Sequence, residues 1–579
     1  MSYHRLTGVI LASILLCFGH TPGWAQPAPE RAPGEAVPTA PQPFSVVEQS
    51  FADMQQAMAA GRVTSQQIVR QYLERIDRYE DDLGATLAIN AGALLQAARL
   101  DRERAAGKVR GPLHGIPVAL KDNIHTTDMP TTGGALAFTD YTPPYEATLV
   151  ANLKEAGAII LAKTTLTELA NWVATGMPNS YNAIRGYGYN PYDPRKDPRK
   201  GLDDGRGVMD TGGSSSGIGT AANLWAANIG TETSGSIQIP ANNTGLAAIK
   251  PTVGRISRHG IIPITADQDT AGPMARYVAD AAALLAAMES VDPEDDATGI
   301  CEPPGDEGYA PQLDPEGLRG ARIGIPRAFF YEPVTPPGAE APAGGLNPAE
   351  AAAMKEAMAV LRKLGAEVVD PADIPSVVAR NVEDNQLLFG NCYDLPQGKG
   401  GDAGCSVVMK YGMKRDFNHW LDSLGDTAPV PSLTALREFN LAHRDAGAIR
   451  YDQAQLDISD QMKVEADAAR YRADRDKDIR LSRKEGIDAA LQRHKLDALL
   501  LPSWKGENIL NKAGYPAVIV PFTVVPNVLN PPAPEGFDPV PIPFGVTFIG
   551  TACSEPRLIE LAYAFEQATR SRQAPALFP

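Results

Sequence analysis

The sequence lacks the short motifs with which proteins commonly bind metal ions. It has no CxxC pair, no HExxH segment and no cluster of cysteines and histidines, and only 5 of its 579 residues are cysteine. Those motifs space thiolate and imidazole ligands around an ion such as zinc. We therefore expect no metal in the functional site.

Positive charge is also in short supply. The chain has 53 Lys and Arg residues against 69 Asp and Glu residues, which gives a formal net charge of −16. A nucleic acid or an anionic membrane surface attracts proteins through basic patches. We therefore expect no nucleic-acid partner. The hydrophobic share of 44% is that of a folded, globular protein.

Long apolar runs are absent except at the N-terminus. Residues 6–18 form one uncharged run after Arg5, and small residues precede Gln26. This pattern is typical of a secretory signal peptide, and the run is too short to cross a bilayer. We expect a signal peptide at residues 1–25, a proline-rich leader at residues 26–43, and a periplasmic or secreted mature protein. No stable membrane anchor is expected after cleavage.

Cysteine usage fits export. Four cysteines follow the predicted signal peptide, and sequence alone leaves three ways to pair them. Cys392 and Cys405 bracket a glycine-rich loop, so they are our choice for a disulfide in an oxidising compartment. Two unpaired thiols remain the alternative.

Apolar patterning predicts an alternating α/β chain. We expect strands at residues 116–120, 158–162, 322–325, 367–369, 498–501, 517–520 and 546–549. We expect helices at residues 68–76 (after a capping box of Thr64 and Gln67), 152–157, 164–172, 278–288, 348–364 and 555–569. Residues 186–210 and 333–347 are rich in proline and glycine and read as loops. The sequence therefore predicts a sheet with helices on its faces.

Three polar segments stand out between residues 121 and 236. Lys121 follows a predicted buried strand, residues 212–217 read GGSSSG, and residues 230–237 read GTETSGSI. Each segment alone is typical of a surface lysine or an ordinary turn. Together they hold a serine nucleophile, a base that burial could keep neutral, and glycines that let backbone N–H groups converge on an oxyanion.

The chain resembles the amidase signature family of serine hydrolases at several segments in the expected order. These are residues 111–124 (GPLHGIPVALKDNI), 212–217, 230–241 (GTETSGSIQIPA) and 245–257 (GLAAIKPTVGRIS). The motifs KTTLTELANW and GTETSGS are most similar to the peptide-amidase branch. The resemblance extends from about residue 46 to the C-terminus. It implies an α/β fold with a central mixed, twisted β-sheet covered on both faces by α-helices.

The resemblance also implies the domain plan and the chemistry. Residues 44–579 would form a single domain, with substrate-binding walls in the divergent part, about residues 290–480. Ser236 would be the nucleophile, Ser214 the bridging serine and Lys121 the base. The reaction would be hydrolysis of an amide C–N bond through an acyl-enzyme, without cofactors, on a small-molecule or peptide amide that could be a C-terminal peptide amide. Backbone N–H groups would form the oxyanion hole, contributed by Thr233, Ser234, Gly235 and Ser236.

Two departures from the family pattern concern the serine segments. The stretch from Ser214 to Ser236 is slightly shorter than is usual, so Ser215 is the alternative for the bridging role. Gln238 stands where the family often has arginine, which removes a fixed cation.

Two other functions remain open. Residues 213–217 match GxSxG, which would make Ser215 the nucleophile of an α/β-hydrolase. Its histidine would be one of His259, His419, His443 and His494. The chain could also be a catalytically inactive, exported amide- or peptide-binding protein on the same scaffold.

Nothing in the motifs selects the substrate. Aromatic residues of the divergent part either line an apolar pocket or belong to the core; they are Phe329, Phe330, Tyr331, Tyr411, Phe417 and Trp420.

Overall fold

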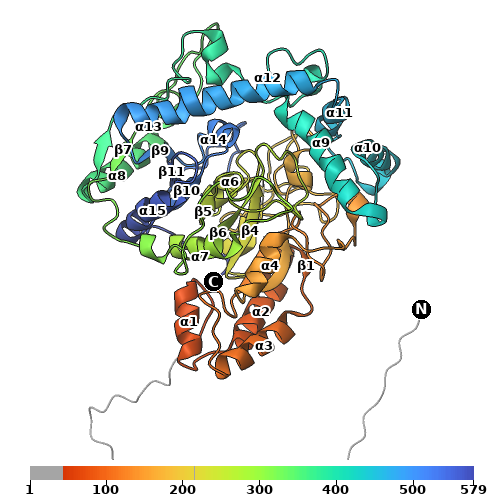
Figure 1. The fold of residues 1–579 in the computed structure, drawn as a ribbon, viewed down its shortest axis with the longest axis vertical. Helices are drawn as coiled ribbons and strands as arrows, with labels where there is room; N and C mark the ends of the chain where they lie inside the picture. The colour runs from red at the N-terminus through yellow and green to blue at the C-terminus, as the bar shows by residue number, and fades with distance from the viewer. Residues whose placement is uncertain (1–43, 214) are drawn as a thin grey trace, which may run out of the picture. The chain divides into compact units, whose positions relative to one another are not determined.

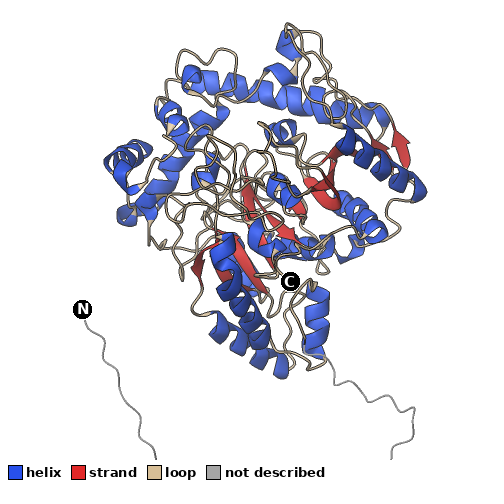
Figure 2. Ribbon diagram, turned by 180° about the vertical axis from the view of Figure 1, so that it is seen from behind, coloured by secondary structure: helices blue, strands red, loops and turns tan. Residues whose placement is uncertain are grey.

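A single β-sheet runs through the molecule (Figures 1 and 2). The structure is a computed structural model that describes residues 44–213 and 215–579, so the predicted leader and Ser214 lie outside the described residues. Within that part of the chain, eleven strands follow the order β1-β3-β2-β4-β6-β5-β10-β11-β9-β7-β8. Their bounds are β1 Thr86–Ile89, β2 Pro117–Lys121, β3 Ile159–Thr164, β4 Ala227–Glu232, β5 Ala247–Lys250, β6 Thr270–Ala275, β7 Arg322–Gly324, β8 Glu367–Val369, β9 Ala498–Pro502, β10 Ala517–Val525 and β11 Ile542–Ile549.

The sheet is mixed, as expected. Strand β2 is parallel to both of its neighbours, β3 and β4, and β7 is parallel to β8 and β9. The central strands β4, β6, β5, β10 and β11 pair antiparallel. Strand β2 therefore ends next to β4, which brings the lysine segment beside the second serine segment.

Fifteen α-helices lie in the described residues, and none of them combines the length and the apolar composition that a bilayer crossing needs. Figure 1 shows α9, α10 and α11 grouped at one side, and α12 and α13 running along the edge of the molecule. The bounds are α1 Phe51–Ala59, α2 Ser65–Leu83, α3 Ala93–Ala105, α4 Thr148–Glu155, α5 Gly217–Ala221, α6 Gln238–Asn243, α7 Val278–Met288, α8 Pro348–Lys363, α9 Val408–Ser423, α10 Leu433–Ala442, α11 Ala454–Asp460, α12 Ala468–Ile479, α13 Asp488–His494, α14 Glu507–Ala513 and α15 Glu555–Thr569.

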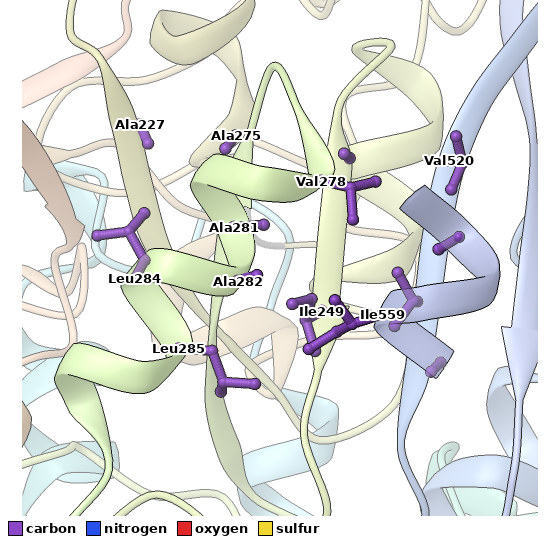
Figure 3. Close-up of a cluster of buried hydrophobic side chains, with 14 of the residues drawn as sticks. Ala227, Ile249, Ala275, Val278, Ala281, Ala282, Leu284, Leu285, Val520 and Ile559 are labelled. Carbon is purple, nitrogen blue, oxygen red and sulfur yellow. The ribbon is translucent and has the colours of Figure 1, made fainter. Parts of the chain in front are cut away.

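One face of the central strands is covered by α7 and α15 (Figure 3). Leu284 and Leu285 of α7 and Ile559 of α15 are fully buried in the same apolar cluster as Ile249 of β5. Helix α7 is rich in alanine, and these short side chains let the helix lie close to the strands. This layer forms the main core.

The opposite face carries the serine segment. Side chains of a strand alternate between the two faces. Ala248, next to Ile249, therefore joins a separate buried cluster with Met274 of β6 and Ala241 of α6. Ile237, the residue after Ser236, belongs to this cluster. The fold prediction of a mixed sheet with helices on both faces is confirmed, and it places the predicted chemistry on the α6 face.

One predicted helix, at residues 164–172, is wrong. Strand β3 continues to Thr164, and Glu168–Asn171 forms only a short turn. Leu169, Ala170 and Asn171 have positive φ angles of 43°, 55° and 71°. The Glu168 N–H donates to Tyr181 O and the Leu169 N–H donates to Gly133 O, so distant segments replace the helical bonds. The leucine spacing resembles that of a helix, but these tertiary contacts decide the conformation.

All four cysteines of the described residues are disulfide-bonded. Cys392 bonds to Cys405, as predicted, and Cys301 bonds to Cys553. The first closes a short loop, whereas the second joins the start of the divergent part to the C-terminal region.

Candidate active site

Lys121 is the last residue of β2, and its side chain is completely buried. Its Nζ donates a hydrogen bond of 2.9 Å to Thr231 Oγ1 on the neighbouring strand β4. Burial disfavours the charged ammonium and lowers the pKa of Lys121 to about 7, although the carboxyl groups of Asp269 and Glu232 act in the opposite direction. A neutral amine, which can accept a proton, is therefore accessible near neutral pH.

The neighbouring residue, Asp122, serves a different purpose. It forms a buried ion pair of 3.0 Å with Lys163, and it accepts a hydrogen bond from the Thr132 N–H. Within the described residues, no carboxylate lies within ion-pair distance of Lys121. The charge of Asp122 is thus neutralised by Lys163. The adjacent Lys121 has no salt-bridge partner among the described residues.

The second serine segment turns sharply where β4 ends. Glu232 accepts hydrogen bonds from the N–H groups of Ile237 and Gln238, at 2.6 and 2.9 Å, and from the Gln238 side chain at 2.6 Å. Gly235 has a φ of 88°, a conformation that favours glycine. The Gln238 amide is therefore bound directly to the Glu232 carboxylate.

Four consecutive backbone N–H groups in this turn have no acceptor among the residues that the structure describes. Within the described residues, none of the N–H groups of Thr233, Ser234, Gly235 and Ser236 donates a hydrogen bond. Converging free donors of this kind can stabilise an oxyanion. The segment thus has the donors that the sequence predicts, next to the Ser236 hydroxyl.

Ser236 opens onto a cavity of about 440 Å³. The size is that of a small-molecule site. Its lining combines the serine segment with the left-handed turn after β3 and with the loop that carries Tyr393. The lining residues include Gly213, Thr233, Ser234, Asn171, Trp172 and Tyr393.

The glycine-rich segment passes close to the nucleophile segment. A Cβ atom at Gly213 would lie 2.9 Å from Ser236 Oγ, and a Cβ atom at Gly212 would lie 2.5 Å from Pro240 N. Only glycine fits at these two positions without displacing neighbours. Ser214 lies outside the described residues. The Ser215 hydroxyl donates to Gly212 O at 2.9 Å.

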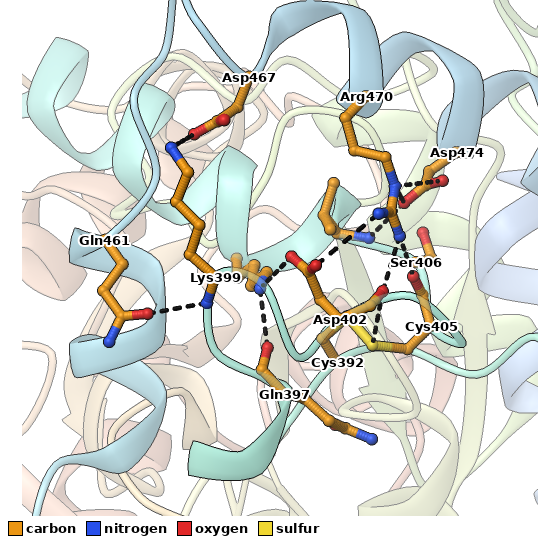
Figure 4. Close-up of polar contacts among 12 residues, drawn as sticks. Cys392, Gln397, Lys399, Asp402, Cys405, Ser406, Gln461, Asp467, Arg470 and Asp474 are labelled. Carbon is orange, nitrogen blue, oxygen red and sulfur yellow. Dashed lines mark hydrogen bonds and ion pairs between the residues drawn. A yellow bond between two sulfur atoms is a disulfide. The ribbon is translucent and has the colours of Figure 1, made fainter.

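One wall of the cavity comes from the divergent part of the chain, including Tyr393 and Met409. Figure 4 shows the Cys392–Cys405 disulfide of this part and the polar contacts around it. The Tyr393 ring packs against that of Trp172 at an interplanar angle of 54°, with centroids 5.5 Å apart. Tyr393 follows Cys392 directly, so the Cys392–Cys405 disulfide fixes the base of this wall. Arg470 donates to the Cys405 carbonyl at 3.0 Å and ties the same loop to α12.

A second cavity of about 520 Å³ lies near the serine segment. Phe329, Phe330 and Trp504 line it together with Glu507. Glu507 is also close to Gly235, since a Cβ atom at position 235 would lie 3.2 Å from its Cγ. Of the candidate pocket aromatics, Phe329 and Phe330 therefore line a cavity. Trp420 lines a further cavity with Tyr145 and His259, whereas Tyr331, Tyr411 and Phe417 are buried in the core.

The histidines do not support the GxSxG alternative. Among the described residues, none of them contacts Ser215, whose hydroxyl is bound to Gly212 O and lies 3.3 Å from Thr211 Oγ1. His259 stacks on Tyr145, and His443 stacks on Phe439. The structure therefore places no base of this type beside the glycine-rich segment.

Several residues of the site escaped sequence reasoning. Asn123 donates to Thr231 Oγ1 at 3.1 Å, and Gln268 and Asp269 contact Thr233. Asn123 and Thr231 lie inside the family-like segments 111–124 and 230–241, so their position in those segments was a signal for the site. Gln268 and Asp269 precede β6, and only the pairing of β6 with β4 brings them to the serine segment.

Comparison with known proteins identifies the family. The family model described as Amidase matches residues 67–383, more than half of the chain. The native peptide amidase from Stenotrophomonas maltophilia is 36% identical, with a TM-score of 0.75, over 92% of this chain and 99% of that chain. A peptide amidase in complex with the competitive inhibitor chymostatin gives the same identity and TM-score, over 92% of this chain and 100% of that chain.

A plant protein is also similar to this chain. A probable amidase of Arabidopsis thaliana is 32% identical over 544 residues, which cover 92% of this chain and 92% of that protein. The buried lysine, the free N–H groups around Ser236 and these matches lead to one conclusion. The chain belongs to the amidase signature family and is a hydrolase acting on amide C–N bonds.

Proposed function

We propose that this chain is an exported amidase that hydrolyses C-terminal amides of peptides through Ser236, Ser214 and Lys121. The observation that carries the proposal is the complete burial of Lys121 beside β4, the strand that leads directly to Ser236. Burial leaves the lysine able to act as a base near neutral pH, which a serine nucleophile requires.

The reaction begins with two proton transfers. Neutral Lys121 takes the proton of the Ser214 hydroxyl, and Ser214 takes the proton of the Ser236 hydroxyl. Ser236 Oγ then attacks the carbonyl carbon of the amide and forms a tetrahedral intermediate. Its negatively charged oxygen accepts hydrogen bonds from the free N–H groups of residues 233–236.

The second half of the reaction reverses the relay. The ammonium of Lys121 returns its proton through Ser214 to the amide nitrogen, the C–N bond breaks, and ammonia leaves. The acyl group stays on Ser236 as an ester. Water then gives a proton to the same relay and attacks the ester carbonyl, which releases the carboxylic acid and restores the Ser236 hydroxyl.

The peptide-amide substrate is supported by the cavity and by the relatives. A cavity of about 440 Å³ that combines aromatic rings with the amides of Asn171 and Asn179 can hold the end of a peptide. A peptide amidase and its chymostatin complex are among the matching structures.

The test is ammonia release from a panel of amides. The panel contains acetylated dipeptide amides, free amino-acid amides, an aryl amide and a cyclic amide, and it is applied to the mature protein. We expect the dipeptide amides to react fastest. We expect Ser236→Ala to lower kcat/KM by about 10⁴-fold or more. Lys121→Ala should be inactive at pH 7 and regain part of its rate at high pH, where hydroxide can deprotonate serine.

Matched controls make the result interpretable. Ser45→Ala and Lys108→Ala change exposed residues of the same types and should keep full activity. Binding of peptide amides without ammonia release by any of the proteins would contradict the proposal and support the binding-protein alternative. Faster turnover of the aryl or cyclic amide would keep the amidase and overturn the peptide substrate.

A further inference from the structure

Thr233 is held at two points from outside the serine segment. Its hydroxyl donates to Asp269 Oδ1 at 2.5 Å, and its carbonyl oxygen accepts from Gln268 Nε2 at 2.9 Å. Both partners precede β6, which pairs antiparallel with β4, so that Glu232 lies opposite Thr270. These two side-chain hydrogen bonds therefore connect the chain segments just beyond the last residue pair of β4 and β6.

Asp269 also connects Thr233 to the segment that carries Ile264. Its second oxygen, Oδ2, accepts hydrogen bonds from the N–H groups of Ile264 and Thr265, at 2.8 and 3.0 Å. Ile264 lines the same cavity as Ser236. With a 7% exposed side chain that receives three hydrogen bonds, Asp269 is fixed in place.

We propose that Asp269 is a positioning residue of the amidase reaction, which orients the Thr233 N–H toward the oxyanion and places a negative charge near Lys121. The proposal rests on the proposed function, because it assigns both effects to the Ser236 and Lys121 chemistry. Asp269 acts through Thr233 and Lys121 and does not itself touch the substrate.

The orienting effect follows from which Thr233 groups are bound. The hydroxyl and the carbonyl of Thr233 are both held, whereas its N–H donates no hydrogen bond within the described residues. The Gln268 bond fixes the peptide plane that joins the Thr233 carbonyl to the Ser234 N–H, and the Asp269 bond holds the Thr233 residue whose own N–H lies in the preceding plane. Both N–H groups therefore keep their direction without reorganisation during the reaction. Such preorganised donors are what stabilise a developing oxyanion most strongly.

The charge effect depends on the groups around both residues. Lys121 faces the carboxyl groups of Asp269 and Glu232, and both raise its pKa against the larger effect of burial. Asp269 in turn faces Asp416 and Arg258. Burial raises the pKa of Asp269 to about 7, while its hydrogen bond to Thr233 and the Arg258 guanidinium act in the opposite direction. Above about pH 7, where Asp269 is ionised, its carboxylate contributes to the proton affinity of the base.

The experiment compares pH profiles of kcat/KM for Asp269→Asn and the parent enzyme. Asparagine keeps the shape but has no charge and only one accepting oxygen, so it can keep either the bond from Thr233 or the two bonds from Ile264 and Thr265. We expect the acid limb of the profile to move to lower pH by about one unit, because the charge that raises the pKa of Lys121 is gone. We also expect kcat to fall about 10-fold with KM changed less than about twofold.

Thr233 provides the second measurement. Thr233→Val removes the hydroxyl and should lower kcat about 10-fold, whereas Thr233→Ser keeps the hydroxyl and should restore most of the rate. In Thr233→Val, the Asp269→Asn change should reduce kcat less than it does in the parent, because one contact is already lost. If Asp269→Asn does not fold, the valine and serine variants decide the orienting role.

The outcomes separate this proposal from the proposed function. Asp296→Asn removes an equal charge from an exposed residue and should leave the profile unchanged. An unchanged acid limb and kcat in Asp269→Asn, or a loss explained entirely by less folded protein, would overturn the positioning role while Ser236→Ala stays inactive. A fully active Ser236→Ala would instead overturn the proposed function.

Discussion

At the residue scale, the proposed catalysis depends on the protonation of one lysine. Lys121 has to be neutral to accept a proton, and burial lowers its pKa to about 7. We predict that kcat/KM for the best amide rises as the pH increases through about 7, because the active form is the deprotonated one. A rate profile from pH 5 to pH 10 checks this. A profile that rises only near the usual lysine pKa would contradict it.

The same burial has a cost in stability. Because the pKa of Lys121 is lower in the folded than in the unfolded protein, the unfolded state binds more protons between about pH 7 and 10.5. Stability from this residue therefore increases with pH in that window.

We predict that Lys121→Met raises the free energy of unfolding at pH 7 by about 1 kcal/mol, because an apolar side chain is buried more favourably than an amine. The same change should abolish activity, because the base is gone. Urea unfolding measures the difference. Lys108→Met, at an exposed position, should change neither quantity. A destabilised Lys121→Met protein would show that the lysine supports the fold.

At the element scale, the loop closed by Cys392 and Cys405 carries one wall of the cavity. Tyr393 lies next to this disulfide and contacts Trp172. We predict that Cys392→Ser with Cys405→Ser raises KM for amides, because the Tyr393 wall loses its anchor, and lowers the free energy of unfolding by about 3 kcal/mol.

The other disulfide is the matched control. Cys301 and Cys553 lie outside the residues that line the Ser236 cavity. We expect Cys301→Ser with Cys553→Ser to lower stability while KM stays the same. Steady-state kinetics and urea unfolding of both double variants check the pair of expectations. Equal KM values in all three proteins would show that the loop does not depend on its disulfide.

Elements with strong local signals were predictable from the sequence. The helices at residues 278–288 and 555–569 have the predicted bounds, and the strand before Lys121 ends where expected. The turn at Glu168–Asn171 was not predictable, because its backbone N–H groups donate hydrogen bonds to the carbonyl groups of Gly133 and Tyr181. Local periodicity does not contain such distant partners.

At the scale of the whole molecule, the sheet order assembles the site. Strand β2 lies beside β4 and β4 beside β6, so Lys121, Ser236 and Asp269 come from three neighbouring strands or their ends. The three motifs could be recognised in the sequence, but the role of Asp269 could not. It depends on a pairing between strands that the sequence pattern does not specify.

Export also concerns the whole chain. The sequence predicts cleavage before Gln26, a region outside the described residues. We predict that the protein purified from a secreting host begins at Gln26, because the short apolar run and the small residues before it are typical of a signal peptide. Intact mass and N-terminal sequencing check this. A retained N-terminus beginning at Met1 would contradict export by this route.

The most direct test of the central claim is to find the residue that carries the acyl group. The protein is mixed with a slowly hydrolysed peptide ester, quenched in acid and mapped by mass spectrometry. We predict an acyl adduct on the peptide that contains Ser236, and no adduct in Ser236→Ala. An adduct on Ser214 or Ser215, or rapid amide turnover with no serine adduct at all, would contradict the account.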